Sequence, residues 1–141
     1  MMRNVIRVVA APLVLSLFAL GCSDSVAGPE AAVLLGQYGS SVQNFELLAT
    51  RAGVELRSAC RESFVATRPA VLGADGSFLL QGRWYQPSGL QGEMAATLKG
   101  TLAGDEVQVT VHAARPGAAP AEVLTLQRGE SFDAGQLPCP L

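Results

Sequence analysis

The sequence predicts an all-β domain: a small antiparallel up-and-down barrel, or a closely packed sandwich, of about eight strands. Two observations carry this prediction. Apolar and polar residues alternate with a period of two in several segments, and short turn-forming sequences separate those segments. Such alternation is typical of antiparallel sheets with one face on the core and one face in water. Short strands joined by tight turns are typical of small barrels and sandwiches.

The alternation is clearest in the middle of the chain. Residues 77–85 place Phe78, Leu80, Gly82 and Trp84 on one face, and residues 106–113 place three valines on one face. The same pattern, followed along the chain, predicts strands at 34–39, 45–50, 54–61, 63–68, 77–85, 93–103, 106–113 and 122–128.

Turn chemistry supports these boundaries. Gly104-Asp105 and Asp75-Gly76 supply the glycine that tight hairpin connections require, and Arg51-Ala52-Gly53 fits a three-residue loop. Two longer, proline-bearing loops are expected at Gln86–Gly92 and Arg115–Ala121. The segment Glu30–Leu35 has helical propensity, so a short helix capping one end of the barrel is an alternative to an early strand there.

The first 21 residues have the pattern of a secretory signal. Arg3 and Arg7 precede an uncharged, apolar run of 13 residues, Val8–Leu20. Because a membrane-spanning helix needs about 20 apolar residues, this run is interpreted as a signal-peptide core and not as a transmembrane anchor. The sequence Ala19-Leu20-Gly21-Cys22 follows it and resembles the lipobox of bacterial lipoprotein precursors.

This resemblance implies that residues 1–21 are removed and that Cys22 is diacylated, for example with palmitate, and anchors the chain in a membrane. An ordinary secretory signal is the alternative. Residues 22–29 then form the lipidated cysteine and a flexible tether, and residues 30–141 form the barrel-like domain. Ser23 lacks the acidic charge that retains lipoproteins in the inner membrane, so we expect the outer membrane of the cell envelope.

The charge of the mature chain limits its partners. Without Arg3 and Arg7 it keeps eight basic residues against twelve acidic ones. This mild acidity argues against a nucleic-acid partner, because no basic stripe is present to neutralise phosphates.

Two cysteines remain after Cys22 is assigned to lipid. An exported protein lies in an oxidising compartment, so Cys60 and Cys139 are predicted to form one disulfide. The bridge would close a loop of about 80 residues, for which the chain-entropy estimate is on the order of 4 kcal/mol. Two free buried thiols are the alternative.

No catalytic or metal constellation is visible, so no enzyme activity, metal site or cofactor is predicted. His112 is the only histidine, and it lies on the outward face of its strand without a nucleophile motif or metal partners. The acidic residues are scattered, although a hydrolase that uses two of them from different segments stays an open alternative.

Trp84 and Tyr85 end one strand and face opposite sides of it. Trp84 shares its face with Phe78 and Leu80, so we expect it to fill the core with its N–H bonded near the rim. The alternative places Trp84 and Tyr85 at the mouth of a small ligand cavity.

Two further resemblances concern the mature domain. Gly36-Gln37-Tyr38 resembles the G-x-W opening of lipocalins and other calycin barrels, with tyrosine for tryptophan. A wider pattern is similar to that of small, uncharacterised bacterial β-barrel lipoproteins; its elements are Cys60, Pro69, Leu72, Asp75–Phe78, Gly82–Trp84, Gly100–Asp105 and Cys139. The wider resemblance supports the fold and the disulfide and implies no known activity. Because no nucleophile, base or metal set is visible in the sequence, we expect a non-enzymatic binding or envelope-associated module whose partner is an envelope protein or a small apolar ligand.

Overall fold

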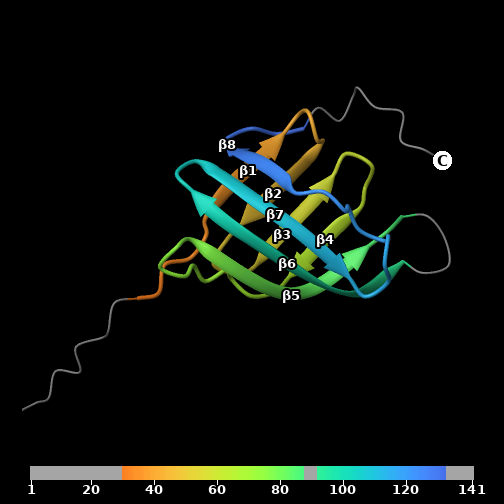
Figure 1. Cartoon of the computed structure of the whole chain (residues 1–141), viewed down its shortest axis with the longest axis horizontal. Helices are drawn as coiled ribbons and strands as arrows, with labels where there is room; N and C mark the ends of the chain where they lie inside the picture. Colours follow the sequence, from red (N-terminus) through yellow and green to blue (C-terminus); the bar gives the residue numbers. More distant parts are fainter. Residues whose placement is uncertain (1–29, 88–91, 133–141) are drawn as a thin grey trace, which may run out of the picture.

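The computed structural model describes residues 30–87 and 92–132. Eight antiparallel strands follow one another around a closed barrel, and the last strand pairs with the first (Figure 1). The strands are β1 Gly36–Ser40, β2 Phe45–Ala49, β3 Val54–Ser58, β4 Ser63–Ala66, β5 Ser77–Tyr85, β6 Glu93–Ala103, β7 Glu106–Ala113 and β8 Leu124–Arg128. The all-β, up-and-down barrel predicted from the sequence is therefore confirmed, and the sandwich alternative is not the fold.

The alternative of a short helix at Glu30–Leu35 is wrong: the described part of the chain contains no helix. Val33 instead forms an isolated antiparallel bridge with Val71. Leu34 N–H donates to Ala70 O at 2.9 Å, and the Leu34 side chain is fully buried. Pairing with the β4–β5 connection thus supplies backbone hydrogen bonds to this segment. Leu34, and not a helix, closes one end of the barrel interior.

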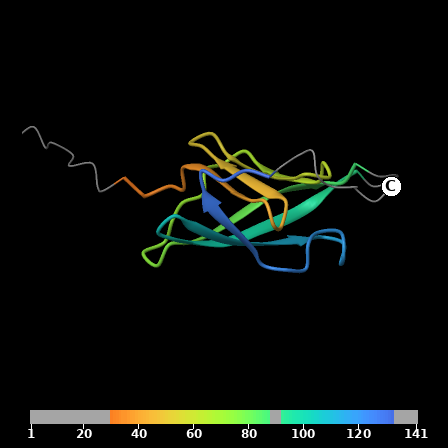
Figure 2. The same ribbon diagram turned by 90° about the horizontal axis from the view of Figure 1, so that it is seen from above.

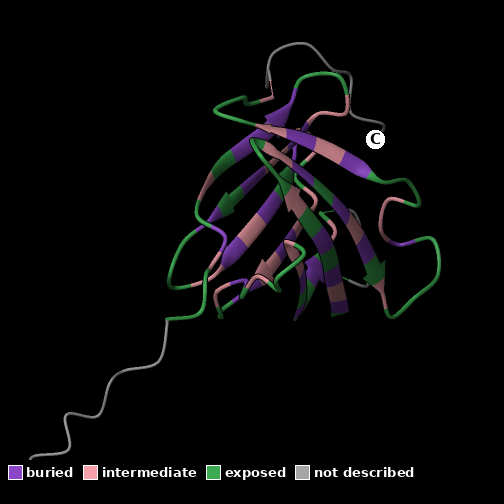
Figure 3. Cartoon of the chain, turned by 60° about the vertical axis from the view of Figure 1, so that its left-hand side comes forward, coloured by how far each residue is buried: buried purple, intermediate pink, exposed green. Residues whose placement is uncertain are grey.

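Side chains fill the barrel interior. Inward and outward residues alternate along the strands, as the buried and exposed bands in Figure 3 show. Large and small residues are matched across the interior: a Cβ at Gly82 would meet the ring of Phe64, and a Cβ at Gly100 would meet the ring of Phe78. The two glycines therefore make room for the two rings in a closely packed core.

The barrel is closed by a short seam between β1 and β8. Main-chain pairing there is limited to Tyr38 with Arg128 and Gly39 with Gln127. The side-chain amide of Gln43 extends this seam, because its Nε2 donates to Val123 O at 3.0 Å and its Oε1 accepts from Thr125 N at 2.7 Å. Gln43 thus pairs with β8 much as a backbone amide would.

After β8 the chain turns back over the outer face of β1. Gly129 has a positive φ of 78°, and its N–H donates to Gln37 O at 2.8 Å. A Cβ on Gly39 would collide with the backbone of residues 130 and 131. The glycine at position 39 is therefore what lets the tail lie directly on the strand.

The barrel has two distinct ends. We call the end at which Glu30 leads into the barrel the entry end; it also carries the β2–β3, β4–β5 and β6–β7 connections. The opposite end, the far end, carries the β1–β2, β3–β4, β5–β6 and β7–β8 connections. Figure 2 shows the segment before β1 and the β7–β8 connection on opposite sides of the molecule. No helix in the described residues is long and apolar enough to cross a membrane.

Candidate binding groove at the far end

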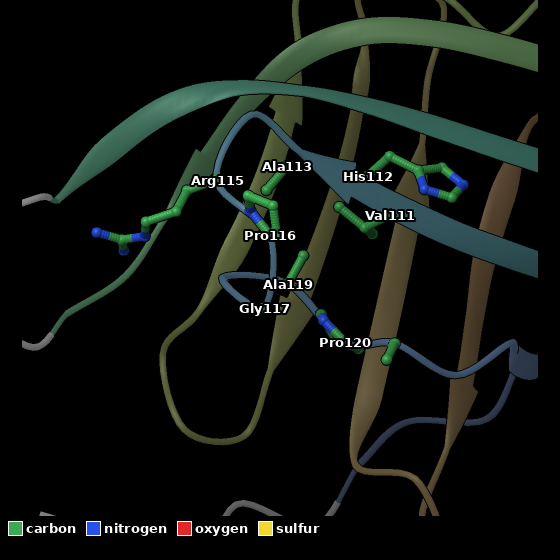
Figure 4. A pocket seen from close by; sticks show the side chains of 9 residues that line it. Val111, His112, Ala113, Arg115, Pro116, Gly117, Ala119 and Pro120 are labelled. Carbon is green, nitrogen blue, oxygen red and sulfur yellow. The ribbon is translucent and has the colours of Figure 1, made fainter.

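A surface groove lies where β7 runs into the β7–β8 connection. One hollow of about 320 Å³ and a second hollow of about 220 Å³ are both lined by His112 and Ala113, and we call the two together the β7 groove. The first hollow is lined by Val111, His112, Ala113, Arg115, Pro116, Gly117, Ala119, Pro120 and Ala121 (Figure 4). The second is lined by Gln81, Ala95, Ala96, Thr97, His112, Ala113 and Ala114.

The lining of the β7 groove has a simple chemistry. Arg115 and His112 lie on opposite sides of the first hollow, with small side chains between them (Figure 4). Thr97 and Gln81 supply a hydroxyl and an amide in the second hollow. The residues that line the two hollows include no carboxylate. The lining of the groove thus includes Arg115, His112, a hydroxyl and an amide beside several alanine and proline residues.

The loop that forms the groove is pinned to the core through Ala118, which is 6% exposed. Its carbonyl accepts hydrogen bonds from Trp84 Nε1 at 2.8 Å and from Gln86 Nε2 at 2.6 Å. Arg115 Nη2 in turn donates to Gln86 Oε1 at 3.0 Å. Because a buried indole and a partly buried amide hold one carbonyl, the loop is positioned before any partner binds.

Gln86 also links the loop to the β3–β4 turn. It donates to the Glu62 carboxyl, and burial raises the pKa of that carboxyl above its ordinary value while the Gln86 hydrogen bond opposes the rise. The preceding residue, Arg61, has a positive φ of 71°. Through Gln86, side-chain hydrogen bonds connect Glu62 in the β3–β4 turn with Arg115 in the β7–β8 loop.

A third hollow, of about 360 Å³, lies beside that turn. It is lined by Glu55, Arg57, Ser58, Ala59, Arg61, Glu62, Ser63 and Phe132. Its cations and anions are partly paired, since Arg57 lies 3.7 Å from both Glu46 and Glu55. Phe132 places the polypeptide that follows β8 next to the turn that contains Cys60.

The structure locates most of the residues singled out in the sequence. Trp84 is fully buried with its N–H bonded near the rim, as the core interpretation predicts, and Tyr85 faces outward with 36% of its surface exposed. His112 is exposed, as predicted. Cys60 lies in the β3–β4 connection; it is not a free thiol, and its partner lies outside the described residues. Cys22 and Cys139 also lie outside the described residues.

Three features of the site were not predicted from the sequence. They are the contact of Trp84 with Ala118, the contact of Arg115 with Gln86, and the hollow beside Phe132. The first two join residues 34 and 29 positions apart, and no local pattern marks them. The only available signal was the proline content of the β7–β8 loop.

No set of metal ligands is present among the described residues. Within residues 30–87 and 92–132, no group of three or more His, Cys, Asp or Glu side chains is placed to hold a metal ion. Comparison with protein-family models, with curated proteins and with solved structures gives no significant match to this chain.

Proposed function

We propose that this chain is a bacterial lipoprotein anchored by lipid on Cys22, and that its barrel is a non-enzymatic binding or envelope-associated module. The observation that carries the proposal is the separation of the two barrel ends. Glu30, the first described residue after the lipobox-like sequence, leads into the entry end, whereas the β7 groove lies at the far end. The module would thus present its groove away from its anchor.

The length of the tether supports this orientation. Seven residues, 23–29, separate Cys22 from Glu30, and a fully extended chain of that length reaches at most about 25 Å. The entry end is therefore held near the lipid surface, and the far end faces the envelope space. Ser23, after the lipidated cysteine, favours the outer membrane over the inner membrane.

A small apolar ligand inside the barrel is the first alternative. The packed interior argues against it, because fully buried side chains such as Tyr38, Phe64 and Trp84 occupy the space that a ligand needs. The emission of Trp84 tests it directly. A ligand that entered the interior would disturb the indole bonded to Ala118 and shift the emission, whereas binding in the β7 groove would leave Trp84 buried.

A carboxylate-dependent hydrolase is the second alternative, and one observation favours it: Glu55 and Glu62 line the same hollow. Burial raises the pKa of Glu62, as a general acid requires. Reproducible turnover of a glycan or ester substrate that is lost in Glu62→Gln would establish this activity. Turnover that is undetectable, or unchanged in Glu62→Gln, supports the binding module.

Detergent partitioning tests the anchor. We expect the native chain to enter the detergent phase and Cys22→Ser to stay in the aqueous phase, because lipid supplies the membrane affinity. Entry of Cys22→Ser into detergent would contradict lipidation as the anchor. Ser23→Asp, which adds the missing acidic charge, is expected to move the protein to the inner-membrane fraction.

Site-directed photocrosslinking in the native envelope tests the far end. A photoreactive residue at Arg115 is expected to give a discrete crosslinked species, and the same residue at Ala52 is not. Ala52 is the matched control because it is exposed in the β2–β3 connection of the entry end. Equal crosslinking from both positions would contradict a partner at the far end.

A further inference from the structure

We propose that the outer edge of β5 at Leu79–Gln81 binds an extended, acidic peptide segment of a partner protein, which adds to the barrel as a further strand. This site shares only Gln81 with the lining of the β7 groove, and it does not depend on the lipid anchor. Four features carry the inference: the short pairing of β4 with β5, the direction of the β5 main chain, the hollow beside it, and the charge of that hollow.

The pairing of β5 is unequal on its two sides. On one side it pairs with β6 along its whole length, from Ser77 with Thr101 to Tyr85 with Glu93. On the other side its pairing with β4 runs only from Ser63 with Tyr85 to Val65 with Arg83. After Ala66, the last residue of β4, the chain no longer pairs with β5 and continues to Val71, which pairs with Val33. The first half of β5 consequently has a strand neighbour on one side only.

The main chain of Leu79 and Gln81 faces the open side. In an antiparallel strand, the N–H and C=O groups of alternate residues point to alternate edges. Gly76 O accepts from Leu102 N, so even-numbered residues face β6; Ser77 O accepts from Gly73 N, so odd-numbered residues face the opposite edge. Among the described residues, no backbone group outside the strand pairs donates to or accepts from Leu79 or Gln81.

The open side is a hollow of about 320 Å³, lined by Thr67, Arg68, Pro69, Val71, Leu79, Leu80 and Gln81. Pro69, one of the residues that line the hollow, has no N–H and so cannot donate a ladder hydrogen bond to β5. Val71 is 53% exposed and Leu79 is 61% exposed. Unpaired main-chain groups flanked by exposed apolar side chains are the features that strand addition uses, with the ladder giving affinity and the side chains giving selectivity.

The charge of the hollow selects the occupant. Arg68 is exposed and forms no ion pair with the described residues. Lys99 lies directly opposite Leu79 on the neighbouring strand. No carboxylate lines the hollow. An extended segment with apolar residues toward Val71 and Leu79 and an acidic residue toward Arg68 complements all of these groups, and a basic segment does not.

Residue-resolved amide hydrogen exchange tests the edge. In the chain from residue 22 with Cys22→Ser, the amides of Leu79 and Gln81 are expected to exchange on the order of 100-fold faster than those of Leu80 and Gly82, which face β6. Comparable protection of all four amides would overturn the proposal. So would concentration-dependent self-association that protects Leu79 and Gln81, since the edge would then bind a second copy of the chain.

Blocked pentapeptides test the occupant. Val-Glu-Val-Glu-Val is expected to slow exchange at Leu79 and Gln81, and Val-Lys-Val-Lys-Val is not. N-methylation of the peptide amides along one edge should abolish this effect, and methylation along the other edge should not, because an added strand pairs through one edge. No effect of the glutamate peptide at millimolar concentration, or equal effects of all the peptides, would overturn the proposal.

A charge reversal completes the experiment. Arg68→Glu is expected to weaken binding of the glutamate peptide by about 10-fold and to create binding of the lysine peptide. Arg61→Glu is the matched control, because Arg61 is also exposed and forms no ion pair with the described residues but lies at the far end. An equal loss in both variants would show a nonspecific charge effect and would contradict a site at Arg68.

Discussion

Arg128, on the last strand of the barrel, lies across the ring of Tyr38, on the first strand, with its guanidinium carbon 4.8 Å from the ring centroid. Arg128 Nη2 donates to the Tyr38 hydroxyl at 2.6 Å, and that hydroxyl donates to Leu35 O at 3.2 Å. Burial of Tyr38 raises its pKa, although the charge and hydrogen bond of Arg128 oppose the rise. This stack reinforces the seam at which β1 and β8 share few main-chain bonds.

The seam predicts an energetic coupling between these two side chains. Tyr38→Phe and Arg128→Met should each lower the free energy of unfolding by about 1–2 kcal/mol, because each removes a charge-assisted hydrogen bond. In a double-mutant cycle measured by urea unfolding, the two losses should couple by about 0.5–1 kcal/mol. Arg83→Met is the control, since its exposed pair with Glu93 contributes little. Strict additivity of the two substitutions would contradict the coupling.

The raised pKa of Glu62 predicts a pH-dependent gain in stability from Glu62→Gln. When a folded-state pKa lies above the unfolded value, here 4.5, the protonated form contributes stability that is complete below that value. That contribution is lost as the pH rises through the folded pKa. The melting temperature of Glu62→Gln should therefore exceed that of the native protein at neutral pH and match it at about pH 3. Glu122→Gln, at an exposed position, is the control; a gain that persists unchanged at acid pH would contradict this explanation.

The crossing of the C-terminal segment over β1 predicts a steric effect at Gly39. Gly39→Val should displace residues 130 and 131 and lower the free energy of unfolding by about 1–3 kcal/mol, because the added side chain meets backbone that cannot rotate away. Limited proteolysis should then cut the C-terminal residues faster than in the native protein. Gly92→Ala is the matched control, since an added Cβ there meets only Gln86 O, at 3.8 Å. Equal proteolysis of the two variants would contradict the contact.

The strands were predictable because their signal is local. Alternation alone placed β5, β6 and β7 at the residues where the structure has them, since apolar side chains with a period of two have one buried face. The helical alternative for Glu30–Leu35 was wrong because the backbone of that segment pairs with residues near Ala70, which overrides local propensity. Local sequence patterns also could not predict the candidate site, because its contacts join residues that are far apart in the sequence. The contacts that position the groove join Trp84 with Ala118, 34 residues apart, and Arg115 with Gln86, 29 residues apart.

The position of Phe132 bears on the predicted Cys60–Cys139 disulfide. Phe132 lines the same hollow as Ala59 and Arg61, the two neighbours of Cys60, so the chain passes this turn seven residues before Cys139. A bridge between the two cysteines is therefore within reach of the segment that follows Phe132. It would hold the β3–β4 turn, and with it Glu62, against the end of the chain.

Intact-mass analysis with an alkylating reagent is expected to show neither Cys60 nor Cys139 modified before reduction and both modified after it. Cys60→Ala and Cys139→Ala should each lower the free energy of unfolding by about 2–4 kcal/mol under oxidising conditions, because each opens the same loop of about 80 residues. The double variant should lose no more than either single variant, since the second substitution removes nothing further. Under reducing conditions all four proteins should unfold at nearly the same urea concentration. Alkylation of both cysteines before reduction would contradict the bridge, and additive losses in the double variant would indicate that each thiol stabilises the fold separately.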